Sequence, residues 1–129
     1  MANTKVQLSP QIEVHHPLEL KLESWPIDIS LITSGEPRAS GVVLHKSADG
    51  KTADGVWECT PGSFRWNYTW DETVYILKGR FSIVSEGGER IHLQAGDVVH
   101  FPNGLRATWE IAETVRKVFS LSSNQVLDL

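Results

Sequence analysis

Trp66-Asn67-Tyr68-Thr69-Trp70-Asp71-Glu72 is the stretch that decides the fold of this chain, together with Gly79, which lies seven residues after Glu72. Aromatic residues alternate with polar ones up to the acid, which is the two-residue period of a β-strand with one face turned inward. The stretch therefore predicts that Trp66 and Tyr68 point to one interior space, which Glu72 reaches from the start of the next strand.

Outward from this stretch, short turn signals divide the chain into many strands. They include Ala48-Asp49-Gly50, Asp54-Gly55, Pro61-Gly62, Lys78-Gly79, Glu86-Gly87-Gly88 and Ala95-Gly96-Asp97. Between them lie β-rich runs of strand length at 41–45, 73–77, 81–84 and 97–101. No run is typical of a long amphipathic helix, and we interpret 110–117 as a bend followed by a final strand. The pattern predicts an all-β fold.

The region before residue 38 is less regular. Leu18, Leu20 and Leu22 alternate with charged residues, which favours an edge strand. The N-terminal residues Val6, Leu8, Ile12 and Val14 offer apolar side chains for burial against the rest of the chain or against a second copy. We therefore expect an N-terminal segment, 1–37, that packs on a barrel formed by 38–129 or on a dimer partner.

Composition narrows the function classes. The 129 residues fit one domain, and a formal charge of −4 without long charged runs argues against nucleic acid as a partner. No apolar stretch approaches the length of a membrane span, and no secretory signal follows Met1. Cys59 is the single cysteine, which rules out an internal disulfide and suits a reducing compartment. We expect a cytoplasmic protein.

Two spacings in the chain resemble the two motifs of the cupin superfamily. The first is Gly62, Trp66-x-Tyr68, three residues, Glu72, six residues and Gly79, where cupins carry His-x-His before the glutamate. The second is Gly96, five residues and Pro102-x-Gly104, with the last histidine expected at Ala107. The stretches 55–62 and 109–117 narrow the resemblance to the subfamily of ureidoglycine aminohydrolase and the ethanolamine-utilisation Q protein. The resemblance implies a single-domain cupin, an RmlC-like double-stranded β-helix or jelly-roll barrel.

The resemblance also implies positions for metal ligands, but most of them do not carry a ligand here. An indole N–H such as that of Trp66 only donates, and Ala107 has no ligand atom. Tyr68 binds a metal only as phenolate, and ionising a phenol at pH 7 costs about 4 kcal/mol. Glu72 alone cannot build a site of three or four ligands. We expect no metal cofactor. A divalent metal held by Glu72, waters and a substrate oxygen stays open, as does a site from His45, His92 and His100.

The barrel interior is the place where we expect the functional site. We take Glu72 and Tyr68 as the candidate catalytic residues, because a carboxylate enclosed by aromatic rings is suited to general acid or base chemistry. The candidate ligand-binding residues are Trp66, Trp109, Trp57, Cys59 and Lys117. For Trp57 and Trp70 core packing is the favoured interpretation, and Cys59 fits a buried small hydrophobe better than a nucleophile. Lys117, in the last strand, either pairs with Glu72 or with an anionic substrate or, as is more common for such a lysine, is simply exposed.

Two functions follow from this candidate site. The first is a small-molecule-binding cupin without the usual histidine ligands, whose pocket centres on Tyr68 and Glu72. The second is an enzyme acting on a small ureido, amino or carboxylated metabolite, in the manner of ureidoglycine aminohydrolase, with Glu72 as acid or base or with a nonstandard metal site. The sequence leaves open whether the protein is an enzyme. A homodimer is the expected assembly.

Overall fold

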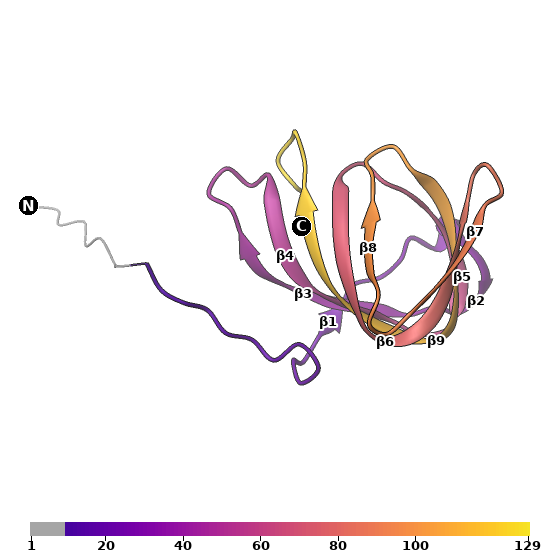
Figure 1. The fold of residues 1–129 in the computed structure, drawn as a ribbon, viewed down its shortest axis with the longest axis horizontal. Coiled ribbons are helices and arrows are strands. Elements are labelled where there is room, and N and C mark those ends of the chain that lie inside the picture. Colours follow the sequence, from indigo (N-terminus) through magenta and orange to yellow (C-terminus); the bar gives the residue numbers. More distant parts are fainter. Residues whose placement is uncertain (1–9) are drawn as a thin grey trace, which may run out of the picture.

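A computed structural model describes residues 10–129 (Figure 1). Val6 and Leu8, two of the apolar residues expected to be buried, lie outside this range. Within it are nine strands and one short 3-10 helix. In chain order they are β1 (Glu23–Ser24), η1 (Ile29–Leu31), β2 (Ile32–Gly35), β3 (Ala39–Lys46), β4 (Thr52–Cys59), β5 (Gly62–Asn67), β6 (Asp71–Ser85), β7 (Arg90–Gln94), β8 (Val98–Phe101) and β9 (Arg106–Ser122).

The strands form one strongly curled antiparallel sheet that wraps into a half-barrel of the jelly-roll type (Figure 1). One path through the sheet runs β1-β3-β4-β9-β5-β2, and β6 joins it through β9 while also pairing with β7 and β8. The two longest strands, β6 and β9, pair along most of their length and curve together through the barrel. These two strands therefore tie both sides of the barrel together.

Lys78-Gly79 is not the turn that the sequence predicts, because β6 continues through it without a break. The pairing of β6 with β9 shifts register between Ile76 and Phe81, so Gly79 lies in a bulged stretch. Gly79 has a φ of +97°, and a Cβ there would lie 2.2 Å from the Thr114 carbonyl oxygen. Only glycine fits this close crossing of β6 over β9. The bend expected at 110–117 is likewise part of the continuous strand β9.

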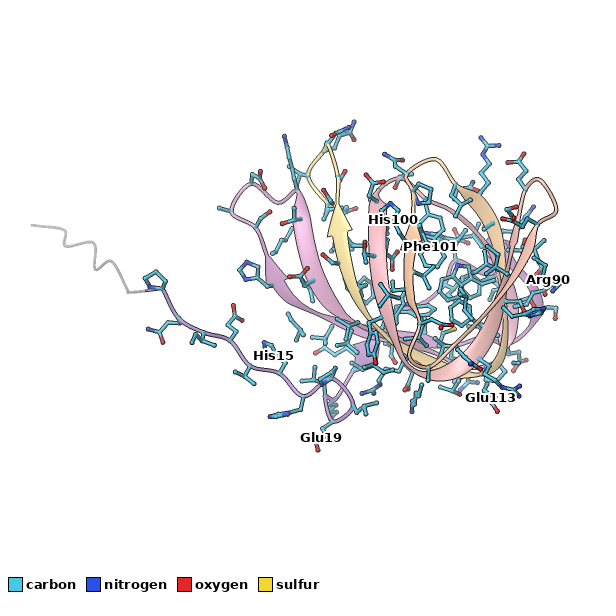
Figure 2. The ribbon with its side chains drawn as sticks, in the orientation of Figure 1. His15, Glu19, Arg90, His100, Phe101 and Glu113 are labelled. Atoms are coloured by element: carbon cyan, nitrogen blue, oxygen red, sulfur yellow. The ribbon has the colours of Figure 1, made fainter. Side chains whose placement is uncertain are left out.

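The N-terminal segment differs from the expected edge strand. Leu18 and its neighbours lie at a turn and not in a strand, and β-pairing begins only at β1, opposite Gly41 and Ser40. Strand β2 then pairs with β5 at the other side of the sheet. The segment before β1 extends to one side of the sheet, and Figure 2 shows His15 and Glu19 on it. Within 10–129 the structure contains no helix long and apolar enough for a membrane crossing.

Aromatic rings fill the interior of the barrel beneath the cavity described below. Trp109 of β9 is 2% exposed and stacks on Phe81 of β6, with ring centroids 4.5 Å apart and planes 5° apart. Tyr68 stacks in the same way on Phe101 of β8, at 5.0 Å (Figure 2 labels Phe101). Such stacked pairs contribute about 0.5–1.5 kcal/mol each beyond the burial of their area. They form a rigid floor under the site.

Candidate functional site

A cavity of about 330 Å³ opens into the barrel, and all five tryptophans of the chain line it. They come from different elements: Trp57 from β4, Trp66 from β5, Trp70 from the turn before β6, Trp109 from β9 and Trp25 from the segment after β1. Trp57 and Trp70 pack against the hydrophobic core, as their favoured interpretation has it, and they also line the cavity. Such a volume is within the range of small-molecule sites.

A buried ion pair lies in the wall of this cavity. Lys117 Nζ of β9 donates to Glu72 Oε2 of β6 at 2.6 Å, and both side chains are less than one-tenth exposed. The other carboxylate oxygen, Glu72 Oε1, accepts from Trp70 Nε1 at 3.2 Å. Both oxygens of Glu72 therefore have fixed partners, and the pair holds one donor and one acceptor group side by side.

Two indole rings hold the ammonium group of Lys117 from the sides. Its Nζ lies 4.7 Å from the ring centroid of Trp57 and 4.8 Å from that of Trp109. The register explains this position, because Trp57 on β4 is directly opposite Lys117 on β9. Contacts of this kind contribute about 0.5–2 kcal/mol. They offset part of the cost of removing a lysine from water, and they fix the charge at one point of the cavity.

Tyr68 is a neutral phenol in this structure. Burial, reinforced by the negative charge of Glu72, raises the pKa of Tyr68 well above its usual value near 10. Its hydroxyl oxygen accepts from Trp109 Nε1 at 3.1 Å. Backbone hydrogen bonds with Leu105 and Gly104 fix the position of Tyr68 between β5 and β6. Because the oxygen is engaged by an N–H group, the hydroxyl proton is the part left to donate to a molecule in the cavity.

Cys59 does not belong to the cavity. Its side chain is fully buried in the hydrophobic core and is not part of the cavity lining. Burial raises the pKa of the Cys59 thiol to about 12, although the charge of Lys117 acts in the opposite direction. A thiol of this kind is not a nucleophile at neutral pH. Its assignment as a ligand-binding residue is therefore withdrawn, and its description as a buried hydrophobe fits the structure.

The residues at the cupin ligand positions do not fit a metal ion. Glu72 is the only carboxylate among them, and the ammonium group of Lys117 lies 2.6 Å from it, where a cation would be repelled. Tyr68 keeps its proton, and Trp66 has only a donor. Among residues 10–129, no group of three or more His, Cys, Asp or Glu side chains is arranged to hold a metal.

The three histidines considered as alternative ligands lie apart from one another on exposed positions. His92 forms a hydrogen bond with Ser82 at 2.7 Å, and His100 forms one with Thr73 at 3.1 Å, so they pair with distant positions of β6. His45 on β3 contacts Glu13 at 3.3 Å. These are pairs between neighbouring segments, and they do not converge on one point.

Comparison with known proteins agrees with this geometry. Residues 46–119 match the EutQ-like cupin domain. The chain belongs to this family. A DUF861 family protein from Thermotoga maritima is 41% identical, over 51% of this chain and 75% of that one, with a TM-score of 0.51. No match was found among curated proteins.

Two further solved structures share the fold of this EutQ-like cupin domain. A DUF861 family protein from Pseudomonas syringae pv. tomato has a TM-score of 0.74 at 24% identity, over 81% of this chain and 45% of that one. The EutQ protein of Clostridium difficile has a TM-score of 0.61 at 17% identity, over 67% and 69% of the two chains. The expected cupin fold and the EutQ-like subfamily are thereby confirmed.

Sequence reasoning missed the cavity residues that lie outside the EutQ-like cupin domain. Trp25, Asp28 and Leu31 line the cavity from the segment between β1 and β2, and Asp128 lines it from the end of the chain after β9. One signal was present in the sequence, because Trp25 is a large aromatic residue in an otherwise irregular region, where a residue of this kind is expected to be buried. A Cβ at Gly41 would lie 2.3 Å from the Trp25 ring, so this glycine makes room for the tryptophan.

Proposed function

We propose that this EutQ-like cupin binds a small organic molecule inside the barrel without a metal. The observation that carries the proposal is that all five tryptophans line one cavity. Tryptophans used only for packing would be spread over the core and the surface of the chain. Their gathering around one donor, Tyr68, and one ion pair, Glu72 with Lys117, matches the usual form of a ligand site, in which apolar walls surround a few fixed polar groups.

In this proposal each polar group has a definite task. Tyr68 donates its free hydroxyl proton to an acceptor oxygen of the ligand, and Trp109 fixes the direction of that donor. The ammonium group of Lys117 has further N–H groups besides the one that donates to Glu72, and these donate to acceptor atoms of the ligand. Glu72 holds Lys117 in place. The indole rings exclude water and stack on the ligand.

Tryptophan fluorescence tests the proposal directly, because every emitting residue lines the cavity. We expect one member of a panel of amino, ureido and carboxylated metabolites to change the emission saturably. Tyr68→Phe should weaken that ligand about tenfold or more, the loss of roughly one hydrogen bond of 1.4 kcal/mol. His100→Ala, on the exposed surface, is the matched control. Equal affinity of the native protein and Tyr68→Phe for every ligand found would refute the Tyr68 site.

The metal-free part of the proposal has its own measurement. Elemental analysis of purified protein should find no metal near one equivalent per chain. Manganese, nickel, zinc and iron(II) should leave the melting temperature of the protein and of Glu72→Gln equally unchanged. A near-stoichiometric metal, or a large shift that Glu72→Gln removes, would contradict it and favour a nonstandard metal site.

A metal-free enzyme is the second candidate, favoured by the position of Lys117. An acid or base needs a partner on the inward face, and Lys117 supplies one 2.6 Å from Glu72. Glu72 would then move a proton while Tyr68 stabilises negative charge that develops on an oxygen of the substrate. Turnover of an amino or ureido ligand, abolished in Glu72→Gln while binding persists, would establish the enzyme. Binding without turnover would instead support the small-molecule-binding function.

We further propose that the protein is a cytoplasmic homodimer. Apolar side chains on the outlying N-terminal segment support a second copy as partner, since Ile12 is 93% exposed and Val14 is 72% exposed. Analytical ultracentrifugation should show a dimer that Ile12→Asp together with Val14→Asp converts to a monomer. Ile91→Asp, elsewhere on the surface, is the control. A native monomer at micromolar concentration would end this part of the proposal.

A further inference from the structure

The charges that line the cavity are unbalanced toward the negative. Among residues 10–129, four charged side chains line it: Asp28, Glu72, Lys117 and Asp128. The 2.6 Å pair between Lys117 and Glu72 leaves those two groups neutral together. Two carboxylates remain, and both are on exposed residues near the solvent side of the cavity. Hydrogen bonds from Ser30 lower the pKa of Asp28, so this group carries its charge at neutral pH.

The aromatic surface of the cavity suits a second cation. Trp66 and Trp70 are half-buried, with ring centroids 6.2 Å apart and planes inclined by 47°. Both residues line the cavity, and ring faces attract cations. The faces of Trp57 and Trp109 already hold the ammonium group of Lys117. Indole faces therefore hold the Lys117 ammonium group inside the protein, and Trp66 and Trp70 offer further indole faces at half-buried positions.

The deep end of the cavity has the opposite preference. Tyr68 is 3% exposed and offers a hydroxyl proton, and Lys117 offers N–H groups beyond its bond to Glu72. These are donors, and they match an oxygen acceptor on a ligand. Asp28 and Asp128 line the same cavity, so a charged group of a ligand bound in it interacts with both carboxylates.

We propose that the ligand is a small organic cation, with an amino or quaternary ammonium group between the tryptophans and carboxylates of the mouth and an oxygen acceptor at Tyr68 and Lys117. This inference rests on the proposed small-molecule function. A purely anionic ligand would meet Asp28 and Asp128 in addition to Glu72, and in the described part of the chain Lys117 is the only opposing charge in the lining. A molecule with both groups satisfies both ends of the cavity.

The test compares molecules of equal shape that differ in charge. Betaine carries a trimethylammonium group and a carboxylate, and tert-butylacetate has the same shape without the positive charge. Choline and its tert-butyl isostere form a second pair that lacks the carboxylate. In isothermal titration calorimetry, we expect each cation to bind at least about tenfold more tightly than its neutral-headed isostere, as expected for a desolvated cation on indole faces.

Variants locate the effect at the mouth. Asp28→Asn keeps the hydrogen-bonding ability of the helix cap while removing the charge, and Asp128→Asn removes the other. The double variant should lose about tenfold in affinity for betaine and choline and keep its affinity for the isosteres. Asp54→Asn, on exposed strand β4, is the matched control and should change neither. Trp66→Leu should weaken the cations more than the isosteres.

The possible results separate this inference from the proposed function. Equal affinity of cations and isosteres would overturn the cation, while a cavity ligand dependent on Tyr68 would still stand. The same holds if neutral or anionic metabolites bind and cations do not. If no molecule of either kind changes the heat or the tryptophan emission, the proposed function itself fails. Cation preference that the double variant does not alter would overturn the role of Asp28 and Asp128.

Discussion

Arg116 and Lys117 are neighbours on β9, yet they stand on opposite faces of the barrel wall. Both are buried, and each pairs with a glutamate from another strand: Arg116 with Glu58 of β4 and Lys117 with Glu72 of β6. Arg116 also donates to the backbone carbonyls of Pro17 and Leu20, so the N-terminal segment covers it. Lys117 meets ring faces and the cavity instead.

The two pairs differ in the groups that surround the positive charge. The groups around Arg116 are all parts of the protein, and they join the N-terminal segment to the barrel. The guanidinium group suits this task, because its planar fork donates in several fixed directions. Lys117 keeps donors that no protein oxygen besides Glu72 engages in the described structure. A buried charge with unused donors facing a cavity is the arrangement of a binding group.

Removing Lys117 should have the largest effect on stability. Lys117→Met leaves Glu72 buried without its partner, and breaking a buried pair in this way costs about 3–5 kcal/mol. Urea denaturation should show this loss in the free energy of unfolding. The double variant Lys117→Met with Glu72→Leu should recover most of it, because no buried charge is left. Lys51→Met, on an exposed position, is the control. A double variant as unstable as the single one would contradict the account.

Removing Arg116 should have an intermediate effect that reaches the N-terminal segment. Arg116→Met deletes the charge-assisted hydrogen bonds of the guanidinium group. One such bond contributes about 1.5–3 kcal/mol, and we expect the free energy of unfolding to fall by about that amount. Hydrogen exchange should increase at residues 17–21, and the cavity should keep its ligand. Arg80→Met removes only an exposed pair with Glu113 and should leave the free energy of unfolding nearly unchanged. Unchanged exchange at 17–21 would show that Arg116 does not hold the segment.

The smallest effect concerns the pH dependence of stability that comes from the buried thiol of Cys59. The raised pKa of Cys59, about 12, means that the folded state keeps the thiol proton after the unfolded state has lost it. The contribution is therefore complete below pH 9 and decreases as pH rises from 9 toward 12, by about 0.8 kcal/mol at pH 9.5. The stability of Cys59→Ala should fall less over this range. The same decrease of stability with pH in both proteins, or rapid alkylation of native Cys59 at pH 8, would show that water reaches the thiol.

Much of the fold follows from the sequence, because strands, turns and glycines are local signals. The turn signals and β-rich runs predicted an all-β fold, and the resemblance of the stretch from Trp66 to Gly79 to a cupin motif implied the barrel. The same reasoning misjudged Lys78-Gly79, since a glycine with positive φ serves a bulge as well as a turn. Which of the two occurs depends on Thr114 passing beside it, and that contact is set by the pairing of β6 with β9.

The site was predictable only in part. The alternation around Tyr68 and Glu72 placed both side chains inside, and the structure puts both on the cavity wall. The pair between Glu72 and Lys117 joins residues 45 positions apart and depends on register, which no local pattern fixes. Local patterns also gave no reason to place Trp25, Asp28 or Asp128 at the cavity. They reach it because segments at either end of the chain fold over the barrel.

Those end segments have a consequence for the choice of ligand. The shared cupin domain, residues 46–119, contains the ion pair and Tyr68, whereas Trp25, Asp28 and Asp128 lie outside it. Mutations at these three positions leave the paired lengths of β6 and β9 intact. Under the proposed function, substitutions at these three positions would change the entrance of the cavity, and with it the choice of ligand, while the paired strands that carry its interior stay as they are.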